Sequence, residues 1–223
     1  MFIVSSINKE NMEELAVITD SSKTSYCDRY GYKFIPKKDN WISSAVGFDK
    51  IFHTLELFYK YPDCEWLLFA ECDSIITNQE VRIEDRIDNN YHFICALAHN
   101  GINSGTFLAR NTEQGRDLLH MIIRHEPKYK HHYWAEQQVL IDAYPQIKDI
   151  VKLVPMRYMN SLQMKLYNSS DSMYHVPYDT VDGYKQSMEW QPEDWIVHWP
   201  GTSNTVRLRH AKDMMEQIYG VQK

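Results

Sequence analysis

The sequence lacks the features that would place it in a membrane or in a disulfide-rich class. It has four cysteines, Cys27, Cys64, Cys72 and Cys95, without paired short spacing, so free thiols in a reducing compartment are the simplest interpretation. No window approaches the roughly 20 apolar residues of a membrane span. The first residues carry no basic region of a secretory signal. We therefore expect a soluble, cytoplasmic protein with no membrane span.

Net positive charge is also missing. The formal charge of −6 leaves no broad basic face against a phosphate backbone, which argues against general nucleic-acid binding. A small anionic ligand held locally by a metal remains compatible with that charge. Hydrophobic residues make up 43% and charged residues 24%, as in ordinary globular proteins. Without a repeat, low-complexity tract or linker, residues 1–223 are predicted to form a single domain.

Apolar runs and helical stripes alternate along the chain. In the first third we expect strands over 1–6, 32–35 and 66–70, and helices over 9–30 and 47–61. This order predicts an α/β fold with a central, mostly parallel sheet flanked by helices. Further strands are expected over 92–97, 106–109, 151–155 and 195–197, and further helices over 111–124, 134–144 and 205–219. Residues 98–105 are expected to form a loop, and residues 162–192 a long ordered loop or lid.

Two acids follow the most apolar strand. The run from Trp66 to Ala70 ends in Glu71 and Asp73, with Cys72 between them. Ligands bind outside the carboxyl ends of strands in open α/β sheets. Carboxylates placed there suit a divalent cation and the phosphates that it carries. For this motif alone, a strand ending in a polar turn with both acids solvated is the alternative.

A histidine near the end of the chain offers a partner for these acids. His198 follows the apolar strand over 195–197, and an imidazole with carboxylates is an ordinary ligand set for Mn²⁺. Gly201 precedes a predicted helix start, whose backbone N–H groups suit phosphate. Arg207 and Arg209 could reach the same charge. The alternative for His198 is a strand-end histidine whose hydrogen bonds are satisfied within the fold.

Five short segments, each a weak signal alone, are more specific when they occur together in one order. They are Glu65-Trp-Leu-Leu-Phe-Ala-Glu-Cys-Asp-Ser-Ile-Ile-Thr-Asn78, Gly101-Ile-Asn-Ser-Gly-Thr-Phe-Leu-Ala-Arg110, Trp134-Ala-Glu-Gln137, Val154-Pro-Met-Arg-Tyr-Met-Asn160 and Val197-His-Trp-Pro-Gly201. In this order the chain resembles, over about residues 1–205, the galactosyl, mannosyl and xylosyl transferase family of GT-A glycosyltransferases. That family includes fungal α-1,2-galactosyltransferases and plant xyloglucan xylosyltransferases.

The resemblance implies a GT-A fold and a metal-dependent glycosyltransferase. Such an enzyme moves a hexose or pentose from a UDP- or GDP-sugar to a glycan or other hydroxyl acceptor with retention, and it uses Mn²⁺ or Mg²⁺. The lack of a membrane anchor separates this chain from Golgi-type relatives and suggests a bacterial, phage or viral source.

The resemblance also implies roles for individual residues. The metal ligands would be Asp73 and His198, together with Glu71, which stands at the first acid of the family's Asp-x-Asp. The residues near the nucleotide or its phosphates would be Ser5, Ser6, Lys50, Gly201 and Arg207. The residues facing the donor sugar would be Asn103, Ser104 and Gly105. Glu136 and Gln137 would lie beside the anomeric carbon, and Arg157 and Asn160 would border the acceptor.

Two departures from the family pattern bear on activity. Glu71 is one methylene longer than aspartate, so it could bind the metal or turn to the ribose. The lysine that follows His-x-x-Gly in the family has no match, and Arg207 is expected to substitute for it. Gln137 is a poor nucleophile, which favours front-face attack by the acceptor over a covalent intermediate on Glu136. The alternatives are a catalytically inactive sugar-nucleotide-binding module and a metal-dependent nucleotidyltransferase.

Overall fold

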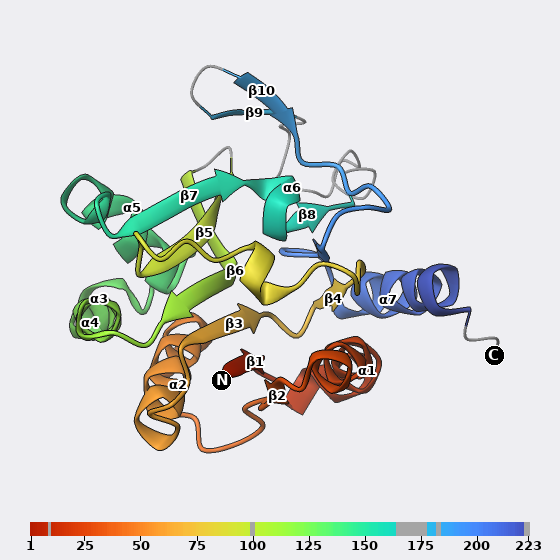
Figure 1. Cartoon of the computed structure of the whole chain (residues 1–223), viewed down its shortest axis with the longest axis horizontal. Coiled ribbons are helices and arrows are strands. Elements are labelled where there is room, and N and C mark those ends of the chain that lie inside the picture. Colours follow the sequence, from red (N-terminus) through yellow and green to blue (C-terminus); the bar gives the residue numbers. More distant parts are fainter. Residues whose placement is uncertain (9, 99–100, 164–177, 182–183, 221–223) are drawn as a thin grey trace.

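A six-stranded sheet forms the centre of the molecule (Figure 1). The computed structural model describes residues 1–8, 10–98, 101–163, 178–181 and 184–220. The strand order is β2-β1-β3-β6-β5-β7, with β1 (Phe2–Ser5), β2 (Lys33–Phe34), β3 (Trp66–Ala70), β5 (Phe93–Ala98), β6 (Gly101–Arg110) and β7 (Val151–Pro155). Only β6 runs antiparallel to its neighbours in this sheet. The predicted α/β architecture with a mostly parallel sheet is therefore confirmed.

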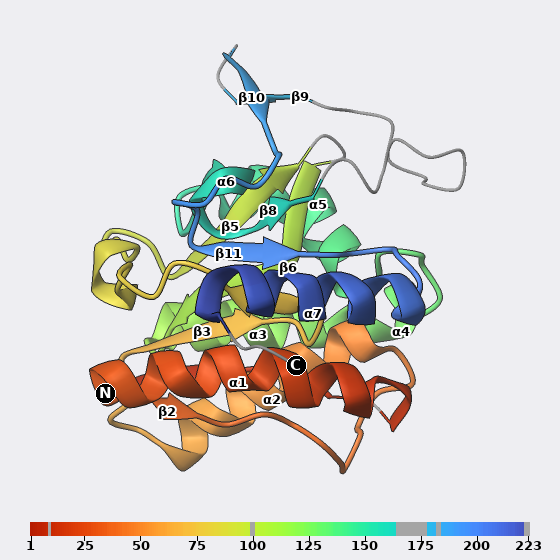
Figure 2. The same ribbon diagram turned by 90° about the vertical axis from the view of Figure 1, so that its right-hand side faces the viewer.

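Helices cover both faces of this sheet (Figures 1 and 2). On one face, Leu67 and Phe69 belong to a core shared with α2 (Val46–Lys60), α3 (Glu113–Arg124) and α5 (Ala135–Ile147). On the other face, Trp66 and Leu68 share a core with α1 (Glu13–Tyr30). Because successive strand residues point to opposite faces, a strand covered on both sides reads as the unbroken apolar run of β3. The remaining short helices are η1 (Glu10–Met12), η2 (Ile83–Asp85), α4 (Glu126–Tyr129) and α6 (Met156–Met159).

A second sheet brings His198 close to the end of β3. It has the order β4-β11-β8, with β4 (Ser74–Ile76), β8 (Ser161–Leu162) and β11 (Ile196–His198). In the antiparallel pair of β4 and β11, His198 lies opposite Ser74. This register puts His198 beside the turn that holds Glu71 and Asp73. The closing helix α7 (Asn204–Tyr219) packs along α1, as Figure 2 shows.

Two expectations for the irregular segments were wrong in part. Residues 101–105, expected to lie in a loop, form the start of β6, where Ile102 pairs with Leu97 of β5. Their polar side chains hide the strand because they face the site rather than an apolar core. The expected loop over 162–192 contains the antiparallel pair β9 (Tyr178–Val181) and β10 (Tyr184–Ser187). The parts of that segment at 164–177 and 182–183 lie outside the described residues.

Local sequence signals account for where the helices begin and end. Gly31 takes a left-handed conformation with φ of 70° and ends α1, which glycine does without a Cβ penalty. The Thr112 hydroxyl caps α3 by accepting from the Gly115 N–H at 3.1 Å. Within the described ranges, no helix combines the length and apolar character needed to cross a membrane. All four cysteines are buried free thiols.

Candidate active site

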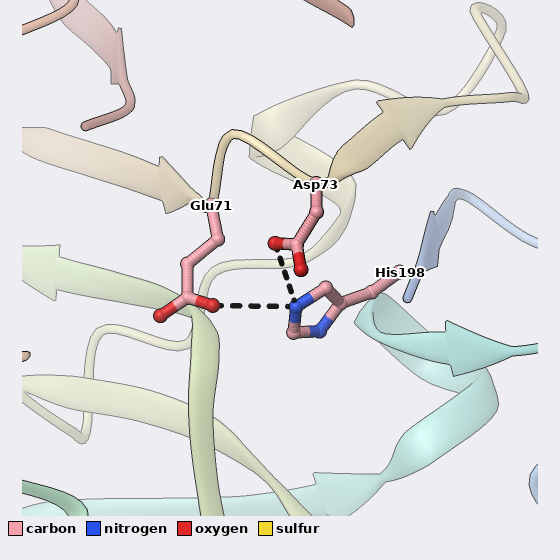
Figure 3. Close-up of side chains that lie close together, drawn as sticks. All are labelled: Glu71, Asp73 and His198. Atoms are coloured by element: carbon pink, nitrogen blue, oxygen red, sulfur yellow. Dashed lines mark ion pairs between the residues drawn. The ribbon is translucent and has the colours of Figure 1, made fainter. Parts of the chain in front are cut away.

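Three side chains from two chain segments, the turn after β3 and the end of β11, converge beyond the end of β3 (Figure 3). His198 Nε2 lies 3.3 Å from Glu71 Oε2 and 3.2 Å from Asp73 Oδ1. One potential ligand atom from each residue lies within 4.8 Å of the others. The structure therefore brings together the three residues that the sequence nominated as metal ligands.

The donor atoms of this cluster suit a divalent transition metal. His198 Nε2 is buried but has no hydrogen-bond partner among the described residues. The other ring nitrogen, Nδ1, donates to Asn160 Oδ1 at 3.0 Å, which leaves Nε2 directed at the two carboxylates. One imidazole nitrogen with two carboxylate oxygens fits Mn²⁺, whereas Mg²⁺ prefers oxygen ligands alone. A buried imidazole nitrogen that faces two carboxylates at 3.2 and 3.3 Å is an arrangement that suits a metal ligand set.

A buried hydrogen-bond network holds the His198 ring from behind. Asn160 is completely buried, and its Oδ1 also accepts from Thr106 Oγ1 at 3.1 Å. Its Nδ2 donates to Asn103 Oδ1 at 2.7 Å, and Asn103 Oδ1 accepts from the Gly105 N–H at 2.9 Å. Partners of this kind fix the tautomer and the orientation of a ligating histidine. Thr106 was not identified from the sequence because a threonine within a strand is too common to signal a role.

Each acid of the site already has a cationic partner. Lys50 Nζ lies 2.8 Å from Glu71 Oε1 and 2.6 Å from Glu136 Oε1. Arg207 Nε lies 2.9 Å from Asp73 Oδ2. Burial would lower the pKa of Lys50, but Glu136 and Glu71 outweigh it and raise that pKa above its ordinary value. Two cations thus face the three carboxylates of Glu71, Asp73 and Glu136.

The protonation of His198 is coupled to the same acids. Burial alone would lower the pKa of His198, but Asp73 and Glu71 raise it to about 9. Burial would raise the pKa of Glu71, yet Lys50 and His198 hold that pKa well below its usual range. Without a metal, His198 therefore carries a proton at neutral pH.

Mn²⁺ binding is expected to strengthen as the pH rises towards 9. The raised pKa of about 9 means that the ion must displace a proton from His198 at any lower pH. The apparent affinity should then increase by up to about tenfold per pH unit, because one proton is released for each ion bound. Calorimetry in two buffers of different protonation enthalpy measures that proton. An affinity that stays constant between neutral pH and pH 9 would contradict His198 as a ligand.

Two adjoining cavities open on either side of Lys50 and Glu71, and Gly47 lines both of them. The first, here called the Arg207 cavity, has a volume of about 410 Å³ and is also lined by Ile7, Asn11, Met12, Val46, Phe69, Cys72, Asp73, Asn204 and Arg207. The second, here called the Gln137 cavity, has a volume of about 340 Å³ and is also lined by Asn103, Gly105, Tyr133, Trp134, Ala135, Glu136, Gln137, His198 and Pro200. Glu71 and Asp73 line the first cavity, and Glu71 and His198 line the second. Each cavity is large enough for part of one ligand.

Two glycines make room for the reactive side chains. A Cβ on Gly105 would lie 2.3 Å from His198 Cε1, and a Cβ on Gly47 would lie 1.6 Å from Glu136 Oε2. Neither distance is tolerable between non-bonded atoms. Glycine at 105 is thus required by the close approach of the His198 ring to β6. Gly47 was not among the residues nominated from the sequence, because a glycine at a helix start gave no signal.

Gly105→Ala is expected to abolish Mn²⁺ binding while the protein stays folded. The new methyl group would push the His198 ring away from Asp73 because the ring is the more movable partner. Thermal unfolding with and without Mn²⁺ measures the loss as a vanished metal-induced rise in Tm. Gly115→Ala is the matched control, since its Cβ would lie 2.0 Å from the Arg110 carbonyl oxygen, away from the site. That variant should lose stability but keep the Mn²⁺ effect, and the opposite pattern would refute this role of Gly105.

Several nominated residues do not open onto either cavity. Ser5 and Ser6 are completely buried, and the Ser5 hydroxyl donates to the Ile35 carbonyl at 2.7 Å. Arg157 forms ion pairs with Asp194 at 2.9 Å and with Glu193 at 3.0 Å. These side chains, like that of the buried Asn160, contact other residues of the protein and line neither cavity.

Ser104 and Gly201 also line neither cavity, but Ser104 contacts two residues that do. The Ser104 hydroxyl donates to Glu136 Oε1 at 2.8 Å, and the Ser104 N–H donates to Gln137 Oε1 at 3.2 Å. Gly201 is exposed with φ of 69° and lies just before α7, whose N-terminal cap is Ser203. The expected helix start after Gly201 is therefore present.

Comparisons with known proteins relate most of the chain to galactosyltransferases. The profile of the galactosyl transferase GMA12/MNN10 family matches residues 1–90 and 88–207. An uncharacterised α-1,2-galactosyltransferase of Schizosaccharomyces pombe is 29% identical over 81% of this chain and 54% of its own length. An α-1,2-galactosyltransferase of the same yeast is 25% identical over 63% of this chain and 48% of its own length. The chain thus spans about half the length of these relatives.

Solved structures agree at the level of the fold. A glycosyltransferase involved in glycosylation of the major capsid of PBCV-1 superposes with a TM-score of 0.72 at 16% identity, covering 95% of this chain and 98% of that one. The galactosyltransferase LgtC, solved with donor and acceptor sugar analogues, gives a TM-score of 0.62 at 12% identity, covering 100% and 98%. At such identities the likeness concerns architecture alone, and it confirms the expected GT-A fold.

Proposed function

The chain belongs to the galactosyl transferase GMA12/MNN10 family, and on that premise we propose that residues 1–223 form one metal-dependent glycosyltransferase domain. It moves a hexose or pentose from a nucleotide-sugar donor to a hydroxyl acceptor, with retention of configuration. The names of its yeast relatives make galactose the first donor sugar to test. The observation that carries this proposal is the meeting of Glu71, Asp73 and His198 between two adjoining cavities.

The arrangement of the cavities suggests how a donor would lie. The Arg207 cavity would take the nucleotide and its diphosphate, because Arg207 and Lys50 supply positive charge there. The Gln137 cavity would take the sugar, beside Asn103, Gly105 and Glu136. Asp73, His198 and Glu71 would hold Mn²⁺ between them. The ion, when bound, neutralises negative charge that develops on the leaving diphosphate.

The contacts of Glu136 favour front-face attack over a covalent intermediate. Its Oε1 is engaged by Lys50 at 2.6 Å and by Ser104 Oγ at 2.8 Å, and the residue is buried. A carboxylate held in this way is a weak nucleophile. Gln137, uncharged, can orient the sugar but cannot attack it. A bond forms between the acceptor oxygen and the anomeric carbon as the bond to the diphosphate breaks, and the acceptor proton passes to a leaving phosphate oxygen.

One screen tests the proposal directly. UDP- and GDP-sugars are added with Mn²⁺, and both thermal stabilisation and slow hydrolysis of the donor are followed. We expect stabilisation by one nucleotide series and release of the nucleoside diphosphate. Stabilisation without any turnover would favour the inactive binding module. Release of pyrophosphate from a nucleoside triphosphate would favour the nucleotidyltransferase.

A further inference from the structure

The acceptor side of the site needs residues other than those nominated from the sequence. The Arg157 guanidinium is held by Asp194 and Glu193, and Asn160 is buried behind the His198 ring. Neither residue lines the Gln137 cavity. A bound acceptor must place a hydroxyl near this cavity, so its binding surface has to be sought along the cavity's rim.

Tyr133 is the exposed aromatic residue of that rim. It is 64% exposed and lines the Gln137 cavity together with His198 and Pro200. Its ring packs edge-on against Trp134, with ring centroids 6.1 Å apart. Covering the exposed face of this ring with the apolar face of a ligand would be favourable. The apolar face of a pyranose ring, with hydroxyls around its edge, suits such a ring because it covers carbon without burying polar groups.

The backbone beside Tyr133 is held in an unusual conformation. Ala135 has a positive φ of 42°, which is rare for a residue with a Cβ. It lies between Trp134 and Glu136, so this turn puts the aromatic pair and the pair Glu136–Gln137 on one cavity. Strained residues of this kind persist where the surrounding structure requires a particular geometry.

We propose that Tyr133 is the residue that positions the acceptor, by stacking on the pyranose ring of a saccharide. The attacking hydroxyl then points into the Gln137 cavity, beside Gln137. This assignment rests on the proposed glycosyltransferase function, because it takes the cavity to hold the donor sugar.

Saturation-transfer NMR with methyl α-D-mannopyranoside and methyl α-D-galactopyranoside tests the subsite without requiring turnover. The wild-type protein, with Mn²⁺ and whichever of UDP and GDP stabilises it, should transfer saturation to the ring protons of at least one glycoside. Tyr133→Ala should weaken binding by about tenfold, because it removes the ring face that the sugar covers. Tyr133→Phe should bind as the wild type does, since the ring is kept. Tyr59→Ala is the matched control, as Tyr59 is 62% exposed on α2 and lines neither cavity.

The outcomes separate this proposal from the broader one. No saturation transfer in the wild type, equal binding by Tyr133→Ala, or equal losses in Tyr133→Ala and Tyr133→Phe would each overturn the stacking subsite. Glycosyl transfer to a serine-containing peptide but to neither glycoside would overturn the saccharide acceptor. Thermal stabilisation by UDP with Mn²⁺ is measured on the same samples. The same measurement is made with GDP, and the absence of stabilisation by either nucleotide would refute the glycosyltransferase function, whatever the glycosides do.

Discussion

Asp73→Ala should reduce Mn²⁺-dependent turnover by about 10³-fold or more. Asp73 is nearly buried and contacts His198 through Oδ1 and Arg207 through Oδ2. Its loss removes one metal ligand and leaves the Arg207 guanidinium without its carboxylate. A bound metal contributes several kcal/mol of charge stabilisation in the transition state, and each 1.4 kcal/mol is tenfold in rate. Steady-state kinetics across a Mn²⁺ titration, with donor hydrolysis as the readout, measures the loss.

Two companion variants separate metal binding from folding. Asp73→Asn keeps the shape and an oxygen near His198, so it should fold normally yet bind Mn²⁺ poorly because the negative charge is gone. Glu71→Asp should retain activity if Glu71 binds the metal, and indifference to Glu71→Ala would place Glu71 outside the ligand set. Full turnover in Asp73→Ala or in His198→Ala would refute the metal assignment. Circular dichroism of each variant shows whether it is folded.

The order of elements was readable from the sequence because each signal was local. The run from Trp66 to Ala70 predicts a strand buried on both faces, and Gly31 marks a helix end. The strand β4 escaped notice because three residues are too few to show a period. The start of β6 escaped because Asn103 and Ser104 face the site and mask the alternation. Polar side chains at positions that face the site interrupt the alternation of apolar and polar residues by which a strand is identified.

The three candidate metal ligands could be predicted from the sequence because each lies at the end of an apolar run that indicates a strand. The acids at 71 and 73 and His198 each stand at the end of an apolar strand. What joins them is the register between β4 and β11, a non-local pairing that no local signal contains. The charge partners depend on tertiary contacts in the same way. Nothing in the chain around Lys50 shows that its ammonium bridges Glu71 and Glu136.

Lys50→Met is expected to lower the free energy of unfolding by about 3–5 kcal/mol, the usual effect of removing one partner of a buried ion pair. Lys50 is 4% exposed and Glu136 is 3% exposed, so the variant would leave the Glu136 carboxylate buried with only the Ser104 hydroxyl nearby. The double variant Lys50→Met/Glu136→Gln should recover most of the loss, because it buries no unpaired charge. Urea unfolding of the wild type, both single variants and the double variant forms the cycle that measures this coupling.

The result of that cycle also bears on whether Glu136 can attack the anomeric carbon of the donor sugar. A strong coupling between Lys50 and Glu136 means that the carboxylate is ionised and committed to the ammonium, which leaves it unsuited to form a covalent bond with the sugar. Loss of less than about 1 kcal/mol in Lys50→Met would mean instead that Glu136 is held without need of the cation. The carboxylate would then be free to attack the anomeric carbon. The buried pair of Lys50 and Glu136, next to Glu71 and the Gln137 cavity, thus connects the stability of the fold with the choice between front-face attack and a covalent intermediate.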